Sequence, residues 1–293
     1  MAYCLSQLQP QITAMSPDIR KSLIEVRDAP EEGIDLAQAC LLLASSQQPD
    51  LDTAAYLQKL DGMAAEVRGR LPADASVTHT LRSLNHYLFA EQGFRSNTQD
   101  YHDPRNHYLN HVLDRRTGIQ ISLSVVYLEL ARRLGLPLEG VSFPGHFLVK
   151  LELEQGLIVL DPFHGGASLN REELELRLRQ VYEGEDVGDE HLAYALQTAD
   201  KRAILVRMLR NLKGLHLRQQ DPERALEHLD MLLTLSPGQA TELLERAALY
   251  ESMECHHAAL RDYEQYLNLY PHAGEADEVH DRVLELRPRA RLH

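Results

Sequence analysis

The chain has 293 residues, of which 44% are hydrophobic and 25% charged, so it is long enough for two globular domains and too apolar to be disordered throughout. Its net charge of −14 argues against nucleic-acid or anionic-membrane partners, which attract basic proteins. The three cysteines stand far apart, which argues against a zinc ribbon or a disulfide framework. With neither a signal sequence nor a membrane-spanning apolar run recognised, the sequence predicts a cytoplasmic protein.

Residues 1–92 predict a helical N-terminal segment. Ser16-Pro17-Asp18 is typical of a helix start, with a capping hydroxyl and a proline in the first turn. Apolar residues recur at helical spacing over Gly33–Ser45 and again over residues 53–67. A further helix is expected from about Ser76 to Ala90.

The pattern changes over residues 93–195, where a compact core is expected. Residues 93–118 are rich in Asn, Asp and His with little apolar period, which is typical of a long ordered loop with a functional role. An apolar helix is expected over Ile121–Leu134, and the chain returns to helix near Asn170. Three short strands lie between them, with a hairpin turn at Gln155-Gly156. The expected strands are Val141–Phe143, His146–Leu153 and Leu157–Leu160.

The last third of the chain contains an internal repeat. Pro237 and Pro271 are 34 residues apart, and several small or Leu positions match at the same offset. These pairs are Ala225/Ala259, Leu226/Leu260, Leu233/Leu267 and Leu235/Leu269. A 34-residue helix–turn–helix period is the tetratricopeptide signature. We therefore predict two repeats, at 200–237 and 238–271, and a cap helix over Glu275–Leu286. The fold class expected for the whole chain is α+β and predominantly α, with a small antiparallel sheet.

Three candidate site residues come from different elements of the predicted core: Gln120, His146 and Asp161. The hairpin places His146 and Asp161 on neighbouring strands two or three residues out of register, within diagonal reach of each other. A carboxylate beside an imidazole fixes its tautomer and raises its basicity, as in the base and orienting group of a nucleophilic triad. The helix start near Gly118 would supply free N–H groups that lower a thiol pKa or hold an oxyanion.

This order of residues resembles the transglutaminase-like superfamily of cysteine enzymes. The matching residues are Gly118-Ile119-Gln120, the run Arg132 to Pro137, the strand-borne His146 and Asp161-Pro162. Several blocks resemble, more closely, the bacterial SirB group, in which a helical segment and a transglutaminase-like core precede tetratricopeptide repeats. These blocks are YLFAEQGF (87–94), DPRN (103–106), LDRRTG (113–118), ISLSVVYLELARRLGLPLEGVSFPGHFLVKL (121–151) and LDPFHGG (160–166). The resemblance covers about residues 15–275 and implies that His146 and Asp161 are a retained triad-like pair.

The chain departs from the superfamily at the nucleophile. Gln120 stands where the active enzymes have Cys, as the resemblance to the SirB group also implies, and no cysteine lies between Cys40 and Cys255. Ser122 is an alternative nucleophile, but it lies about 200° around the helix from position 120 and is more typical of a capping hydroxyl. Cys40 sits in an apolar run and is expected to be a buried structural residue.

The resembling blocks also contain the candidate binding residues, which are Asn106, Arg116, Tyr127, Phe143 and Phe163. A metal site is a rival interpretation, because His107 and His111 are spaced i, i+4 and could share a cation. The chain lacks an HEXXH motif, and a loop makes helical spacing doubtful, so no metal and no cofactor is expected.

The sequence favours a non-catalytic regulatory or adaptor protein, whose degenerate core binds a protein or peptide partner and whose repeats supply a second surface. The alternative is a hydrolase or acyltransferase that uses His146 and Asp161 with Ser122, a water or a metal as the nucleophile. A third interpretation makes the core a structural platform and gives all partner contact to the repeats. These three hypotheses differ in whether the core converts a substrate, binds a partner or only supports the repeats.

Overall fold

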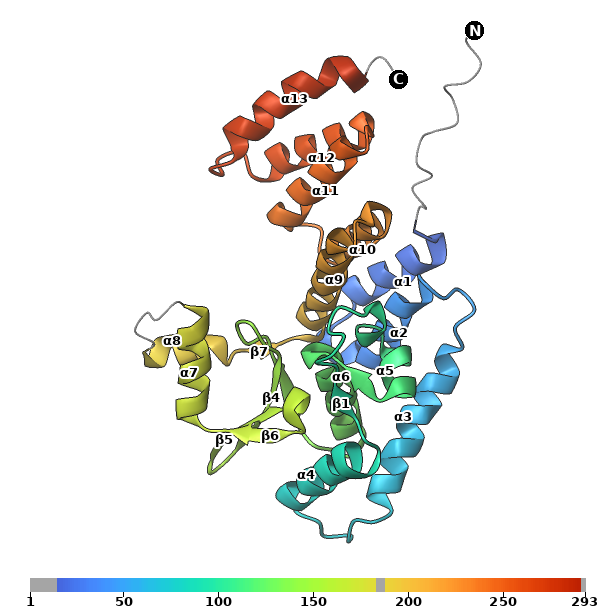
Figure 1. Ribbon diagram of the computed structural model, residues 1–293, viewed down its shortest axis with the longest axis vertical. Coiled ribbons are helices and arrows are strands. Elements are labelled where there is room, and N and C mark those ends of the chain that lie inside the picture. The colour runs from blue at the N-terminus through green and yellow to red at the C-terminus, as the bar shows by residue number, and fades with distance from the viewer. Residues whose placement is uncertain (1–14, 183–187, 291–293) are drawn as a thin grey trace. The chain divides into compact units, whose positions relative to one another are not determined.

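The computed structural model describes residues 15–182 and 188–290 of the chain (Figure 1). It is mostly helical with one small antiparallel sheet, so the predicted α+β fold class is confirmed. No helix in the described ranges is long and apolar enough to cross a membrane.

Contacts within the chain separate two compact units. The core unit is residues 28–208, and the repeat unit combines the described residues up to Arg27 with those from Leu209 onward. Helix α9 (Lys201–Arg218) belongs to both, because its residues up to Met208 lie in the core unit. The sequence-based division into 1–92, 93–195 and 200–293 stays a prediction, but these contacts group residues 28–92 with the core.

The helices of the N-terminal part begin at side-chain caps that the sequence displays. Asp35, Asp52 and Ser76 each accept a hydrogen bond from the backbone N–H three residues further on, which satisfies a free donor at the helix start. The helices are α1 (Pro17–Asp28), α2 (Leu36–Ser45), α3 (Thr53–Arg68) and α4 (Val77–Asn85). The helix predicted to end near Ala90 continues from α4 as a π-helix, η2 (His86–Glu91), which apolar periodicity did not reveal.

The polar segment 93–118 holds more regular structure than the sequence predicts. Its two ends, β1 (Arg95–Ser96) and β2 (Thr117–Gly118), pair as short parallel strands. Between them lie a 3-10 turn, η3 (Pro104–Asn106), and the helix α5 (Leu109–Arg115). The helix was missed because it has only 7 residues, too few to show an apolar period.

The main sheet has five antiparallel strands in the order β6-β5-β4-β3-β7. The strands are β3 (Leu138–Val141), β4 (Leu148–Leu153), β5 (Gly156–Asp161), β6 (Ala167–Leu169) and β7 (Thr198–Ala199). Leu153 pairs with Gly156, so the hairpin turn is the two residues between them, one position earlier than predicted. Two strand predictions are wrong in part: the predicted Val141–Phe143 shares only Val141 with β3, and His146 lies in the turn before β4.

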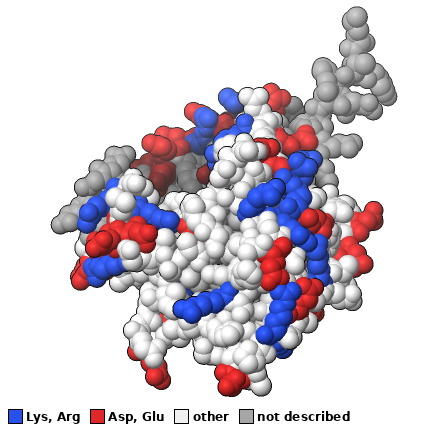
Figure 2. Space-filling view, turned by 60° about the horizontal axis from the view of Figure 1, so that its bottom comes forward, with Lys and Arg blue, Asp and Glu red and all other residues white. Residues whose placement is uncertain are grey.

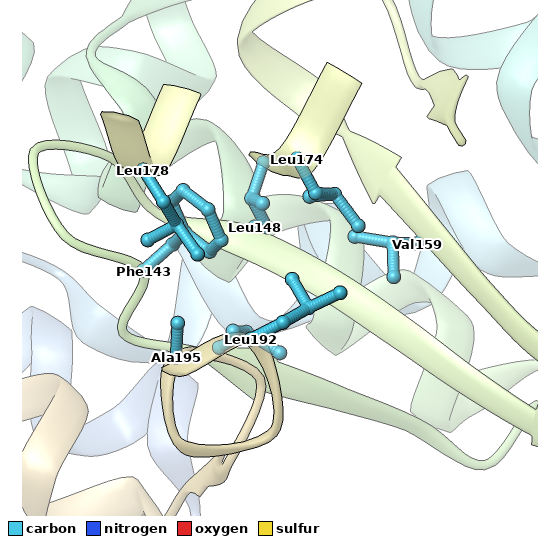
Figure 3. Packing of buried hydrophobic residues seen from close by; sticks show 8 residues of the cluster. Phe143, Leu148, Val159, Leu174, Leu178, Leu192 and Ala195 are labelled. Carbon is cyan, nitrogen blue, oxygen red and sulfur yellow. The ribbon is translucent and has the colours of Figure 1, made fainter. Parts of the chain in front are cut away.

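Helices cover the sheet. Residues 121–131 of α6 (Gln120–Arg133) are all buried, and α6 contacts β3 and β4. Helices α7 (Arg171–Val181) and α8 (Asp189–Ala195) pack on the sheet through the apolar cluster in Figure 3. This cluster comprises Val141, Phe143, Leu148, Val159, Leu174, Leu178, Leu192 and Ala195. Because side chains alternate along a strand, Asp161 shares a face of β5 with Val159, which contacts α7.

The repeat unit contains the helical hairpins that the 34-residue period predicts. They are the end of α9 with α10 (Pro222–Leu235) and α11 (Ala240–Ser252) with α12 (His256–Leu269), followed by the cap helix α13 (Ala276–Ala290). Arg246 links three of these helices, since its Nη1 lies 2.8 Å from Asp230 Oδ1 and its Nε lies 2.7 Å from Asp262 Oδ2. Arg20 on α1 also bonds Asp230, at 2.6 Å, which ties α1 into this unit.

Candidate functional site

Asp161 is the centre of the site. It ends β5 and caps η4 (Pro162–His164), the 3-10 turn that Pro162 begins. Its Oδ1 accepts hydrogen bonds from the backbone N–H groups of Phe163 and His164, at 3.1 and 3.3 Å. These two bonds fix the carboxylate plane and leave Oδ2 directed at other side chains.

Oδ2 of Asp161 accepts three side-chain hydrogen bonds. His146 Nε2 lies at 2.8 Å, His164 Nδ1 at 2.7 Å and Arg177 Nη1 at 2.8 Å. The structure therefore brings together the predicted pair, His146 and Asp161. The last residue pair of the β4–β5 ladder, Val149 with Leu160, places the two residues near each other. His146 lies two positions beyond the residue that would face Asp161 across β4 and β5.

The carboxylate of Asp161 is held ionised. Its side chain is fully buried, and burial by itself would raise its pKa. The hydrogen bond and charge of His146 act in the opposite direction, as do the hydrogen bonds from Arg177 and His164, and the net effect is a pKa well below the usual range. An ionised Asp161 accepts protons only as hydrogen bonds, so its role is to orient donors.

Arg207, on the core part of α9, fixes the turn that carries His146. Its Nη2 donates to the His146 carbonyl oxygen at 2.6 Å, and its Nη1 donates to the Phe143 carbonyl oxygen at 3.3 Å. The guanidinium also lies over the Phe147 ring, 5.5 Å from its centroid. Because this turn lies outside the sheet ladder, Arg207 replaces the strand hydrogen bonds that would otherwise hold it.

The His146 ring is oriented so that one nitrogen stays available. With Nε2–H donated to Asp161, a neutral ring carries its lone pair on Nδ1, which makes no hydrogen bond with the described residues. The ring lies edge-on to Phe163, with centroids 5.9 Å apart and an interplanar angle of 88°. Phe163 in turn lies edge-on to His164, so three aromatic rings surround the Asp161 carboxylate.

The α6 start, where active members of the superfamily carry the nucleophile, holds polar side chains that form hydrogen bonds within the protein. Gln120 is half-buried, and its Oε1 accepts a hydrogen bond from the Tyr101 hydroxyl at 2.7 Å. Ser122 is fully buried; its Oγ donates to the Asn106 carbonyl oxygen at 2.6 Å and accepts from Ile119 N at 3.0 Å. The Ser122 hydroxyl thus has the capping geometry that competed with the nucleophile hypothesis.

The five candidate binding residues divide by exposure. Asn106, Tyr127 and Phe143 are each 0% exposed, so their side chains are not on the surface, and their assignment as binding residues stays a prediction. Their polar atoms are bonded inside the fold: Asn106 Nδ2 donates to the Asp100 carbonyl, and the Tyr127 hydroxyl donates to Asn85 Oδ1. Phe143 is part of the apolar cluster under α7. Arg116, exposed at the left-handed end of α5, and the half-buried Phe163 remain at the surface.

The structure does not group His107 with His111 as cation ligands. His107 lies in the turn before α5 and His111 lies on it, so helical i, i+4 geometry does not apply. In the described ranges, the group of His, Cys, Asp or Glu ligand atoms within 4.8 Å of one another is His146, Asp161 and His164. Arg177 already brings a positive charge to the same Oδ2, which opposes a metal ion there.

Two residues of the site were missed from sequence. His164 had a local signal, because it lies three residues after Asp161 in the block LDPFHGG, within reach of a carboxylate that caps a turn. Arg177 had none that could be used. It reaches Asp161 only because Leu174 and Leu178 anchor α7 to the sheet, which is a tertiary event (Figure 3).

Comparison with known proteins covers the whole of this site. The family model of the transglutaminase-like superfamily matches residues 54–210, which is more than half of the chain. This chain belongs to the transglutaminase-like superfamily. A tetratricopeptide repeat model matches residues 212–284.

Proteins similar in sequence to this chain occur in bacteria and in mammals. A UPF0162 protein of Xylella fastidiosa is 40% identical over 256 residues, which is 87% of this chain and 91% of the relative. F-box only protein 21 of Mus musculus is 35% identical over 185 residues, which is 59% of this chain but 28% of that protein. A crystal structure of menin superposes with a TM-score of 0.41 at 12% identity, over 83% of this chain and 68% of menin, too weakly to carry an argument.

Proposed function

We propose that this protein is a non-catalytic regulatory or adaptor protein, which binds a protein or peptide segment at a degenerate transglutaminase-like site and through its repeats. The observation that carries the proposal is the state of the α6 start. Gln120 there accepts a hydrogen bond from Tyr101, and the Ser122 hydroxyl is hydrogen-bonded to the backbone of Asn106 and Ile119. No cysteine occurs in the chain between Cys40 and Cys255. The His146–Asp161 pair therefore lacks a side chain to activate.

Cys40 does not supply the missing thiol. It is fully buried on α2, and burial, together with the negative charges of Glu129 and Asp35, raises its pKa well above the ordinary value for a thiol. A nucleophilic cysteine needs the opposite surroundings, accessible and electropositive. This supports a structural role for Cys40 and a core without thiol chemistry.

The same site is suited to holding a peptide. His146 Nδ1 can accept a hydrogen bond from a backbone N–H, and the Phe163 ring offers an apolar edge beside it. The His164 side chain is 58% exposed, so a ligand can reach this group of rings without opening the core. Tetratricopeptide repeats supply a second surface of the kind that commonly binds proteins.

A peptide-display selection on the full chain, followed by affinity measurement on purified protein, tests this function. Peptides that use the site should bind at least about tenfold more weakly to Phe163→Ala, because one buried aromatic contact contributes about 1.5 kcal/mol or more. Leu157→Ala is the matched control, since Leu157 is an apolar residue of β5 that is 44% exposed and away from the rings. Equal loss in both variants, or no selected peptide that senses Phe163, would contradict the proposal.

A truncation separates the core from the repeats as the binding surface. The cut belongs after residue 208, because Arg207 holds the turn of His146 and a cut at residue 200 would remove it. If residues 1–208 fold and keep the selected peptide, the core binds it. If binding vanishes while the fold persists, all partner contact lies in the repeats and the core is only a platform.

The second candidate function is a hydrolase or acyltransferase with a non-cysteine nucleophile. The observation in its favour is the orientation of His146, whose Nδ1 is left open while Asp161 holds Nε2, as a general base requires. Such an enzyme would label with a serine-reactive probe or hydrolyse peptide and amide substrates, and His146→Ala would abolish either signal. Labelling that depends on His146 would replace the adaptor proposal with this one.

Three further expectations, on the family group, the location and the kind of partner, accompany the proposal. We place the protein in the SirB group on the blocks of sequence given above, and in the cytoplasm. We also propose a protein or peptide as its partner, in preference to a nucleic acid or a membrane. Fractionation of cells that produce a tagged chain tests the location directly.

A further inference from the structure

A second candidate site lies in the core unit, outside the group around Asp161. It is a cavity of about 540 Å³ between the end of α3, the helix α4 and the π-helix η2. This volume lies in the range of small-molecule sites, about 300–1,000 Å³. The polar side chains that line it and enter the argument are Arg70, Ser76, His79, Arg82, Ser83 and His86.

The π-helix shapes one wall of this cavity. Residues five apart on an α-helix point about 140° away from each other, whereas a π-turn brings them to the same side. The bond from Gln92 N to the Tyr87 carbonyl, 2.8 Å long, is such a five-residue step. As a result Glu91 Oε1 lies 3.5 Å from His86 Nε2, and Glu91 Oε2 lies 2.5 Å from Arg70 Nη1.

The cavity has more cationic groups than carboxylates to neutralise them. Glu91 is the carboxylate among its described lining residues, and it is already shared between Arg70 and His86. Glu66 lies beyond the Tyr87 ring and accepts the Tyr87 hydroxyl at 2.9 Å. The Arg82 guanidinium makes no hydrogen bond or ion pair with the described residues, so its charge remains uncompensated.

The positions of these groups let them act together. His79, Arg82 and His86 are spaced three and four residues apart along the continuous helix of α4 and η2, so they share one face. On the face that Figure 2 shows, Lys and Arg side chains lie among Asp and Glu side chains, as expected of a chain with a net charge of −14. At the cavity wall, the uncompensated arginine lies among imidazoles and hydroxyls, so several hydrogen-bond donors are gathered in one place.

We propose that this cavity binds a small phosphorylated molecule, with Arg82 as the main contact to a phosphomonoester. A guanidinium donates two parallel hydrogen bonds to phosphate oxygens, and its charge complements the dianion. His79 and His86 supply imidazole donors on the same face, and the hydroxyls of Ser76 and Ser83 line the same space. The volume is large enough for the rest of a metabolite as well as for its phosphate group.

Calorimetric titration of the full chain tests this site, with inorganic phosphate, O-phosphoserine and adenosine monophosphate as probes. We expect at least one phosphomonoester to bind more tightly than inorganic phosphate. Arg82→Gln should weaken that binding about tenfold or more, because a charge-assisted hydrogen bond contributes at least that factor. Arg179→Gln removes the same charge from an arginine on α7 outside the cavity, 51% exposed, and should leave binding unchanged.

A second variant guards against indirect effects. Thr78→Glu places a negative charge at the cavity wall, in the first turn of α4, where a carboxylate favours the helix, so it should abolish binding without unfolding the protein. The proposal is overturned if no probe binds at millimolar concentration, or if Arg82→Gln and Arg179→Gln behave alike. It is also overturned if a phosphoserine peptide binds far more tightly than free phosphoserine, because the ligand would then be a modified protein.

Discussion

Replacing Asp161 by asparagine should destabilise the core unit by about 3 kcal/mol. Hydrogen bonds to a charged group contribute about 1.5–3 kcal/mol each, and three such bonds converge on Asp161 Oδ2. Asparagine keeps one oxygen for the backbone bonds of η4, but its amide nitrogen would face three donors. Solvent compensates part of this loss, because Arg177 is 28% and His164 58% exposed, so we expect less than the full value of three bonds.

Asp114→Asn is the matched control for this substitution. Asp114 also accepts bonds from two side chains, Lys59 and Tyr56, but it is 48% exposed. Its loss should cost less than about 1 kcal/mol, because solvent screens such pairs. The contrast between the two variants isolates burial from the chemistry of the change, which is the same in both.

Urea unfolding followed by circular dichroism is the assay, because the chain has no Trp to report by fluorescence. Two units need not unfold together, so hydrogen exchange of the peptide that spans β5 and η4 should accompany it. We expect Asp161→Asn to raise exchange there and Asp114→Asn to leave it unchanged. If both variants lose the same free energy of unfolding, the three buried donors at Asp161 stabilise the fold no more than the exposed pair at Asp114.

Acidification should reduce the difference between the wild type and Asp161→Asn. The pKa of Asp161 is lowered by folding, so the unfolded chain binds a proton more readily than the folded one. The contribution of its charge is therefore fully present above the unfolded pKa of about 3.9, and it is lost as the pH falls through the lower folded value. A stability difference that stays constant from pH 7 to pH 3 would contradict an ionised Asp161.

Three further predictions concern other described residues. Ser122→Ala should cost about 1–2 kcal/mol in urea unfolding, because the hydroxyl caps α6 and bonds the Asn106 carbonyl; no loss would mean the cap is dispensable. Gly166→Ala should melt well below the wild type, since Gly166 has φ +71° and a Cβ would lie 2.3 Å from Asn85 Oδ1. The repeat unit should lose stability as the pH falls below about 6.5, because burial lowers the folded pKa of His216 and the unfolded chain then binds more protons. His216→Phe should flatten that pH dependence in melts taken at pH 7.5 and 5.5.

Local rules made some of the site predictable. The two-residue turn after Leu153 sets the register of β4 with β5, and this register brings the start of β4, just after the turn that carries His146, beside Asp161. Caps and apolar periods located α2, α3 and α4, because each signal depends on residues a few positions apart in the chain. The repeat unit followed from the 34-residue spacing of Pro237 and Pro271, which records a periodic architecture directly.

The sequence by itself therefore determined the fold class, the repeats and the pair of His146 with Asp161. Tertiary structure alone decided which other groups share that carboxylate and which candidates are accessible. Arg177 joins the site because α7 packs on the sheet, and Phe143 leaves it because the same packing buries the ring. Neither outcome has a local signal, since burial and side-chain convergence depend on segments distant in the chain. Helices and turns depend on residues close together in the chain, whereas the chemistry of a site depends on the side chains that the complete fold brings around it.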